Sequence, residues 1–298
     1  MTRMSQGRNG LALVTAIGVA SFAGLALVVA PQFVGNAIGP HTERTVTHFE
    51  LPLEPGAALQ VLNGSGRIAV SEYDGDKAQV TVTCESMPRG SMMDQVLHHW
   101  TAGAGVHHEA AAPVVRENGR GVEVSTLGIA PADGETVTYQ FDVKLPRGRS
   151  IEISNGNGAI GVAGIEGDVT AHSDNGDVRC EDVMGRVSAR VRNGGVFCRY
   201  IAGAIDVSTT NGMVEVDAIP AQGHPVRVWT SNGAIKFRAP DLAVRLKATT
   251  ENGRVVSEMA GCGAGVHQTL RMLDTNGGDG AAEVELHALN GNVYVDTI

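Results

Sequence analysis

Apolar and polar residues alternate along most of this chain, and the pair Asn-Gly interrupts the alternation at a nearly constant interval. After each pair, apolar residues stand at the third and fifth positions, as Val178 and Cys180 do after Asn175. A period of two indicates a strand with one buried and one solvated face. The repeat asparagines lie 18, 18, 18, 21 and 20 residues apart, at Asn157, Asn175, Asn193, Asn211, Asn232 and Asn252.

A second alternating strand follows in each repeat after another glycine, for example Gly185 before Val187 and Ala189. Each unit therefore carries two strands and two corners, and so small a unit cannot bury its apolar face alone. We predict an all-β fold, a parallel β-solenoid (β-helix-like) of roughly 18–21-residue coils in which equivalent residues stack about 4.8 Å apart. Asn-Gly between strands is also a strong hairpin signal, so an antiparallel β meander is the alternative.

The N-terminal region carries a long uncharged segment. Twenty apolar residues rise about 30 Å as a helix, enough to cross a bilayer core. Arg3 and Arg8 precede the segment and Glu43 follows it, which places the N-terminus in the cytoplasm by the positive-inside rule. The predicted organisation is a cytoplasmic N-terminus at 1–10, a transmembrane signal anchor at 11–30, a linker at 31–44 and an extracytoplasmic, periplasmic β-solenoid domain at 45–298. A cleaved signal peptide, which would leave a secreted protein, is the alternative.

Stacking in register would place equivalent side chains on one another. The repeat asparagines would then form a ladder at one corner, joined by hydrogen bonds between their side chains. Cys180 would stack on Cys198 at a distance that suits a disulfide, which an extracytoplasmic location permits. Parallel side chains strain such a bridge, and an inward pair of thiols can equally serve as small apolar filler. Both interpretations of this thiol pair stay open.

The alternation breaks at about residues 91–112, where Met92, Met93, Val96 and Leu97 follow helical spacing, so we expect a short helical insert. Neutral imidazoles bind Zn, Cu or Ni, and four histidines fall in this insert. They could meet only if the chain folds back at its glycines, and exposed histidines without a metal are the alternative. These weak metal candidates are His98, His99, His107 and His108.

Composition narrows the function classes. The formal net charge is −9, so the basic footprint of a nucleic-acid binder is lacking. Aromatic residues make up 4% of the chain, which suits a narrow interior filled by Val, Ile and Ala.

Candidate catalytic groups are few. Asp174 and Asp177 place two carboxylates at one corner, and carboxylate pairs perform acid–base chemistry on sugars. Corner aspartates more commonly favour turns, and the neighbouring coils offer no matching cluster. The segment 276–280 resembles a single unit of a calcium-binding β-roll, and we interpret it as a loop. The sequence carries no nucleotide-binding loop and no zinc-protease motif, so we expect no enzymatic activity and no cofactor.

The strand that ends in Leu145-Pro146, followed by Asn155-Gly156 and by repeated Val-x-Gly-x-Val and Asn-Gly cycles, resembles the toastrack family. This is a bacterial adhesin-type domain built of β-strand repeats, with no established activity. The resemblance covers roughly residues 45–298 and is strongest from Val137 to Val256. It implies a non-enzymatic, solenoid-like module associated with the cell envelope.

We therefore expect a membrane-anchored module that binds or scaffolds an envelope protein or a polysaccharide. An envelope-stress sensor is the alternative, and a polysaccharide-active enzyme is a third, weaker hypothesis. The last strand, around Val293–Val295, is expected to form an uncapped end of the stack. Such an edge can pair with a second copy or with another protein's strand, which predicts a homo-oligomer through the C-terminal edge.

Overall fold

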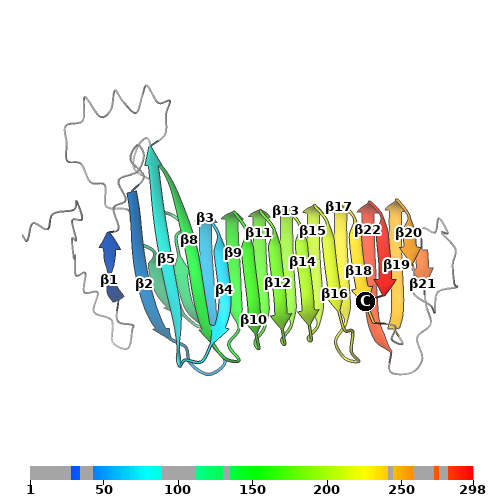
Figure 1. Ribbon diagram of the computed structural model, residues 1–298, viewed down its shortest axis with the longest axis horizontal. Coiled ribbons are helices and arrows are strands. Elements are labelled where there is room, and N and C mark those ends of the chain that lie inside the picture. The colour runs from blue at the N-terminus through cyan, green and yellow to red at the C-terminus, as the bar shows by residue number, and fades with distance from the viewer. Residues whose placement is uncertain are drawn as a thin grey trace, which may run out of the picture.

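The computed structural model describes residues 28–33, 43–88, 112–129, 135–240, 244–257, 272–274 and 281–297. These residues form strands, corners and short loops, with no helix among them. The strands lie side by side in two long sheets along one axis (Figure 1).

The two sheets contain 12 and 11 strands. In spatial order the 12-stranded sheet runs β1 (Val28–Phe33), β2 (Glu43–Pro52), β5 (Lys77–Pro88), β8 (Glu135–Pro146), β4 (Ile68–Tyr73), β10 (Ile160–Ile165), β12 (Val178–Val183), β14 (Val196–Ile201), β16 (Val214–Ala218), β18 (Ile235–Ala239), β23 (Val293–Thr297) and β20 (Val255–Ser257). The 11-stranded sheet runs β21 (Met272–Asp274), β19 (Val244–Asn252), β22 (Ala282–Asn290), β17 (Val226–Asn232), β15 (Ile205–Asn211), β13 (Val187–Asn193), β11 (Val169–Asn175), β9 (Ile151–Asn157), β3 (Ala58–Ser65), β7 (Gly121–Ser125) and β6 (Val114–Asn118).

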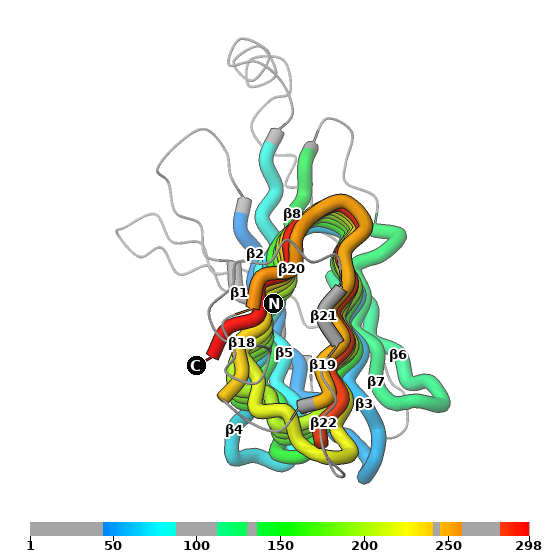
Figure 2. Tube along the Cα trace, turned by 90° about the vertical axis from the view of Figure 1, so that its right-hand side faces the viewer, coloured from blue at the N-terminus to red at the C-terminus, as the bar shows by residue number. Residues whose placement is uncertain are grey.

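Each central coil gives one strand to each sheet, and successive coils pair in parallel. In β12 and β14, Val178 pairs with Val196, 18 residues further along the chain. Viewed along the stack, the coils superpose as one flattened loop (Figure 2). The predicted parallel β-solenoid is therefore confirmed, and the antiparallel meander is not the arrangement of the central coils.

The core is a dry space between the two sheets, filled by rows of matching aliphatic side chains. Val169, Val187, Ile205 and Val226 form one such row, and each is 1% exposed or less. Burial of these rows supplies the main favourable free energy of folding, as the alternating sequence predicts. Because both faces of each central coil contact a neighbouring coil, the coils support one another.

At the C-terminal end, the order of coils in space differs from their order in the chain. The last coil, β22 and β23, lies between the coil of β17 and β18 and the coil of β19 and β20. Tyr294 of β23 therefore has Lys236 on one side and Val256 on the other. The prediction that the strand at Val293–Val295 is an uncapped edge is wrong, because another coil covers it. At this end the edge strand of that sheet is β20, which has only three residues.

At the N-terminal end, too, the order of coils in space differs from their order in the chain. The first coil, β3 and β4, is internal, because β7 and β8 stack outside it. Beyond them the pairing becomes antiparallel, between β8 and β5, β5 and β2, β2 and β1, and β7 and β6. Antiparallel strands thus occur toward the ends of the stack, with β21 on β19 at the opposite end.

Two predicted segments fall largely outside the described residues. Most of the predicted anchor at 11–30 is among them, while its last three residues belong to β1. None of the described residues form a helix that is long and apolar enough to cross a bilayer. The helical insert expected at about 91–112 also lies outside the described residues, except for its last residue.

Candidate binding face of the 11-stranded sheet

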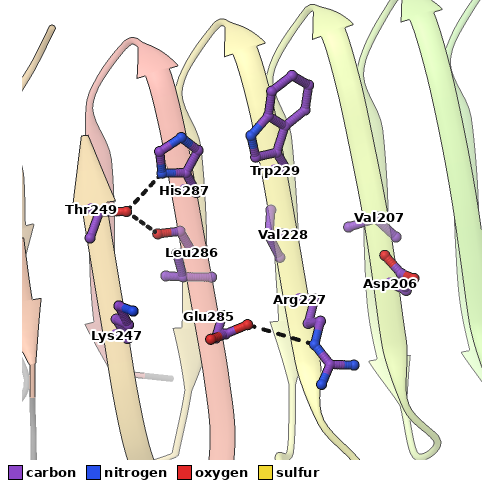
Figure 3. A pocket seen from close by; sticks show the side chains of 10 residues that line it. All are labelled: Asp206, Val207, Arg227, Val228, Trp229, Lys247, Thr249, Glu285, Leu286 and His287. Carbon is purple, nitrogen blue, oxygen red and sulfur yellow. Dashed lines mark hydrogen bonds and ion pairs between the residues drawn. The ribbon is translucent and has the colours of Figure 1, made fainter. Parts of the chain in front are cut away.

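The outward face of β15, β17, β22 and β19 carries a shallow depression of about 360 Å³ (Figure 3). Strand alternation places every second residue on this face, and the parallel register aligns those residues in rows that cross the strands. One row contains Ser208, Trp229, His287 and Thr249, and the row beside it contains Asp206, Arg227, Glu285 and Lys247.

The first row is dominated by two rings. Trp229 is 41% exposed on this outward face. Its ring lies nearly parallel to the His287 ring, at an angle of 15° with the centroids 6.5 Å apart. Figure 3 shows the two rings face-on and next to each other, over β17 and β22. We call this pair the Trp229–His287 platform.

Thr249 fixes the orientation of the histidine. Its hydroxyl lies 2.8 Å from Nδ1 of His287, at hydrogen-bonding distance, and also donates to the carbonyl of Leu286 at 3.5 Å. Three neighbouring strands therefore build the platform: β17 supplies the indole, β22 the imidazole and β19 the hydroxyl. Since all three are held in a continuous sheet, the rings are positioned before any ligand binds.

Charges of alternating sign line the second row. Arg227 pairs with Glu285 at 3.6 Å, with both side chains more than half exposed. Asp206 and Lys247, at the two ends of the row, form no ion pair with any other side chain that the structure describes. The depression thus combines two ring faces with free donors and acceptors, a combination found in sites for small polar ligands.

On the outward face of the 12-stranded sheet, a cluster of charges on β14, β16 and β18 is self-contained. Arg238 donates to Asp217 at 2.6 and 2.8 Å and to Glu215 at 2.6 Å, and the Asp217 hydrogen bond raises the pKa of the guanidinium. Arg199 adds ion pairs to the same two carboxylates at 3.6 and 3.8 Å. Because these charges satisfy one another, this cluster mainly joins neighbouring coils.

The sequence did not reveal the platform. Trp229 was recognisable as an outward residue from the alternation, but its neighbour was not. If the coils followed chain order with their asparagines aligned, Trp229 would lie beside Thr249. The insertion of the last coil brings His287 between them.

The repeat asparagines lie at one corner, where their side chains form a continuous ladder. Six hydrogen bonds of 2.9–3.0 Å join successive members, and in each one Nδ2 donates to Oδ1 of the preceding asparagine in the ladder. The sequence-based set omitted one member, Asn290, which bridges Asn232 and Asn252 because its coil is inserted there. The signal was present as Asn290-Gly291 at the end of the chain. The ladder in spatial order is Asn157, Asn175, Asn193, Asn211, Asn232, Asn290 and Asn252.

Cys180 and Cys198 are register partners and point into the core as free thiols. The hydrogen bond that the Cys198 thiol makes to Cys180, together with complete burial, raises the pKa of Cys198 well above its usual value. In this structure the pair is apolar filler between two coils.

The two aspartates at the Asn175 corner have separate partners. Asp174 lies 3.1 Å from Arg192 and 3.7 Å from His172. Asp177 accepts from Arg179 at 2.7 Å and from the backbone N–H of Gly195 in the next coil at 2.8 Å. The second contact ties adjacent corners together, a structural role for a carboxylate.

The remaining sequence candidates lie outside the described residues: His98, His99, His107, His108 and the segment 276–280. Within the described ranges, no group of three or more His, Cys, Asp or Glu side chains could hold a metal ion.

No family model and no curated protein matches the chain. Its fold is similar to crystal structures of a "putative cell adhesion protein" from Clostridium sporogenes (12% identity, 86% of this chain, 100% of that chain, TM-score 0.36) and a "putative adhesin" from Bacteroides fragilis (10%, 85%, 97%, 0.38). A third, a "putative adhesin" from Parabacteroides merdae, has 8% identity, coverage of 85% and 96%, and a TM-score of 0.30. These names agree in kind with the toastrack resemblance of the sequence, and TM-scores of this size carry no information about what the chain binds.

Proposed function

We propose that this protein is a non-enzymatic, adhesin-like binding module, anchored in the cytoplasmic membrane by residues 11–30. Its solenoid extends into the extracytoplasmic space and binds a component of the cell envelope, a protein or a polysaccharide. The binding surface is the outward face of β15, β17, β22 and β19.

The observation that carries this proposal is the contrast between two outward clusters of side chains, one on the face of each sheet. Both are rigid, because neighbouring coils hold every central strand. On one face, the Arg238 guanidinium donates hydrogen bonds of 2.6–2.8 Å to the carboxylates of Glu215 and Asp217, so these charges satisfy one another. The other leaves Trp229 exposed beside charges that have no partner among the described side chains. Exposed aromatic groups on a rigid scaffold are typical of recognition surfaces.

Binding is tested by co-sedimentation of the full chain, in detergent, with isolated bacterial envelope fragments. Lys247→Glu changes the proposed face, and Lys236→Glu makes the same change at an exposed lysine of β18 on the opposite sheet. We expect Lys247→Glu to reduce the bound fraction severalfold and Lys236→Glu to leave it unchanged. Equal binding by the two variants, or no binding by the unmodified chain, would refute the assignment of this face.

The anchor is tested in cells. A retained anchor keeps the full chain in the membrane fraction after a carbonate wash, while protease added from the extracytoplasmic side digests the solenoid. A shortened chain in the soluble extracytoplasmic fraction would instead show that the N-terminal segment is cleaved.

A further inference from the structure

We propose that the Trp229–His287 platform binds a hexopyranose glycan, with a sugar ring lying on the indole face. This inference rests on the proposed function, because it names the ligand class of the same face.

The rings supply the first part of the site. The face of an aromatic ring carries partial negative charge and attracts polarised C–H groups. A pyranose with equatorial substituents presents a patch of axial C–H bonds of about the same width. Trp229 and His287 lie next to each other over β17 and β22 with their ring planes within 15° of parallel, so the indole and the imidazole belong to one ordered aromatic surface. A flat sugar ring can lie on such a surface without any rearrangement of the protein.

The charged row supplies the second part. Sugar hydroxyls donate and accept hydrogen bonds, and bonds to ionised partners are the stronger ones. Asp206 and Glu285 accept from hydroxyl groups, while Arg227 and Lys247 donate to ring and hydroxyl oxygens. Signs that alternate along the row leave little net charge, which suits a neutral glycan better than a strongly ionic polymer.

The dimensions suit an extended chain of sugars. Both rows run across the strands, which lie about 4.8 Å apart, roughly the advance of one ring along a β-linked glycan. A depression of about 360 Å³ is at the small end of ligand sites and holds one or two such rings. Further rings would continue along the face over β15 and β19.

A protein partner fits this surface less well. A stable protein interface covers about 800 Å² on each side and has an apolar, aromatic core. Among the described residues of β15, β17, β22 and β19, Trp229 is the sole exposed large apolar side chain. The surrounding side chains are charged. Two of them, Arg227 and Glu285, pair with each other and are each more than half exposed.

The probes are cellohexaose and N-acetylchitohexaose, titrated into the full chain in a detergent without a sugar headgroup and followed by calorimetry. Trp229→Ala is compared with Trp229→Phe, which keeps a ring, and with Tyr200→Ala, which removes an aromatic residue that is 64% exposed outside the site. We expect at least tenfold weaker binding for Trp229→Ala, a smaller loss for Trp229→Phe and no change for Tyr200→Ala. The chain has two tryptophans, so in a Trp100→Phe background the sugar should also change the fluorescence of Trp229.

The outcomes separate this inference from the proposed function. The glycan assignment is overturned, while the binding face stands, if the unmodified chain sediments with envelope fragments but binds neither sugar. It is also overturned if the Trp229→Ala variant binds the sugars as tightly as the Tyr200→Ala variant does. Loss of co-sedimentation after protease treatment of the fragments would identify a protein partner and also overturn it. Loss of binding to fragments treated with glycan-degrading enzymes would support it.

Discussion

At the scale of the residue, the corners of the stack allow almost no variation, because one coil's glycine rests on the backbone of the next. Gly194 has φ +147°, and a Cβ added there would lie 2.4 Å from the carbonyl oxygen of Gly176. The Asn-Gly pair therefore meets two separate demands. Asparagine provides a rung of the ladder, and glycine permits the close approach that the rung requires.

Gly194→Ala should destabilise the fold by about 2–4 kcal/mol, since strained backbone and overpacking each cost about 1–3 kcal/mol. Gly161→Ala is the matched control, because a Cβ there meets nothing within 4 Å. We expect it to change stability by less than about 0.5 kcal/mol, as most surface substitutions do. Urea denaturation followed by circular dichroism measures both, and equal midpoints would contradict the tight corner.

The buried thiols should resist modification. The pKa of Cys198 is raised, so its reactive thiolate becomes populated only at higher pH than for an ordinary cysteine, and burial blocks access as well. In a Cys262→Ser variant at pH 8, we expect a colorimetric thiol reagent to label almost nothing in the folded protein. It should label three cysteines after denaturation: Cys84, Cys180 and Cys198. Labelling of Cys84 alone after denaturation would show that the other two form a disulfide.

At the scale of the element, sequence and structure agree on what a coil is and disagree on where the terminal coils lie. The alternation and the Asn157-to-Asn211 period were enough to predict two strands per coil, parallel stacking and the register of the Cys pair. They could not predict that β22 inserts beside β17. Every Asn-Gly coil presents nearly the same rows to its neighbours, so chain order was the only guide to spatial order. The platform was missed for the same reason, because its two rings come from β17 and β22.

The insertion can be tested by chemical bridging. Lys236 of β18 is the register partner of Tyr294 in β23, and Val256 of β20 lies one strand further away. With strands about 4.8 Å apart, a short bifunctional thiol reagent should bridge the Lys236→Cys/Tyr294→Cys pair and not the Lys236→Cys/Val256→Cys pair. The opposite result, read from gel mobility, would mean that the coils follow chain order.

At the scale of the whole molecule, stability is a sum over neighbouring coils, because contacts join each coil chiefly to the next one. The edge strands at the two ends of the stack are built differently. The C-terminal edge strands β20 and β21 have three residues each, and the N-terminal end turns to antiparallel pairing through β2, β5 and β6. Short edges of this kind limit edge-to-edge association.

Amide hydrogen exchange should therefore slow from the ends toward the middle. We expect the greatest protection in β11 to β16, which have coils on both sides, and the least in β20 and β21. Exchange measured by mass spectrometry resolves these segments. Uniform protection along the stack would instead indicate that the coils unfold as one cooperative unit.

The interior position of the last coil has a consequence for biogenesis. The ribosome completes residues 282–297 after residues 244–257, yet the earlier segment joins the stack only through the later one. Growth of the structure cannot simply follow synthesis at this end. Residues 244–257 must therefore wait, with their apolar rows uncovered, until residues 282–297 have been synthesised, and a premature stop near residue 281 would leave them in that state.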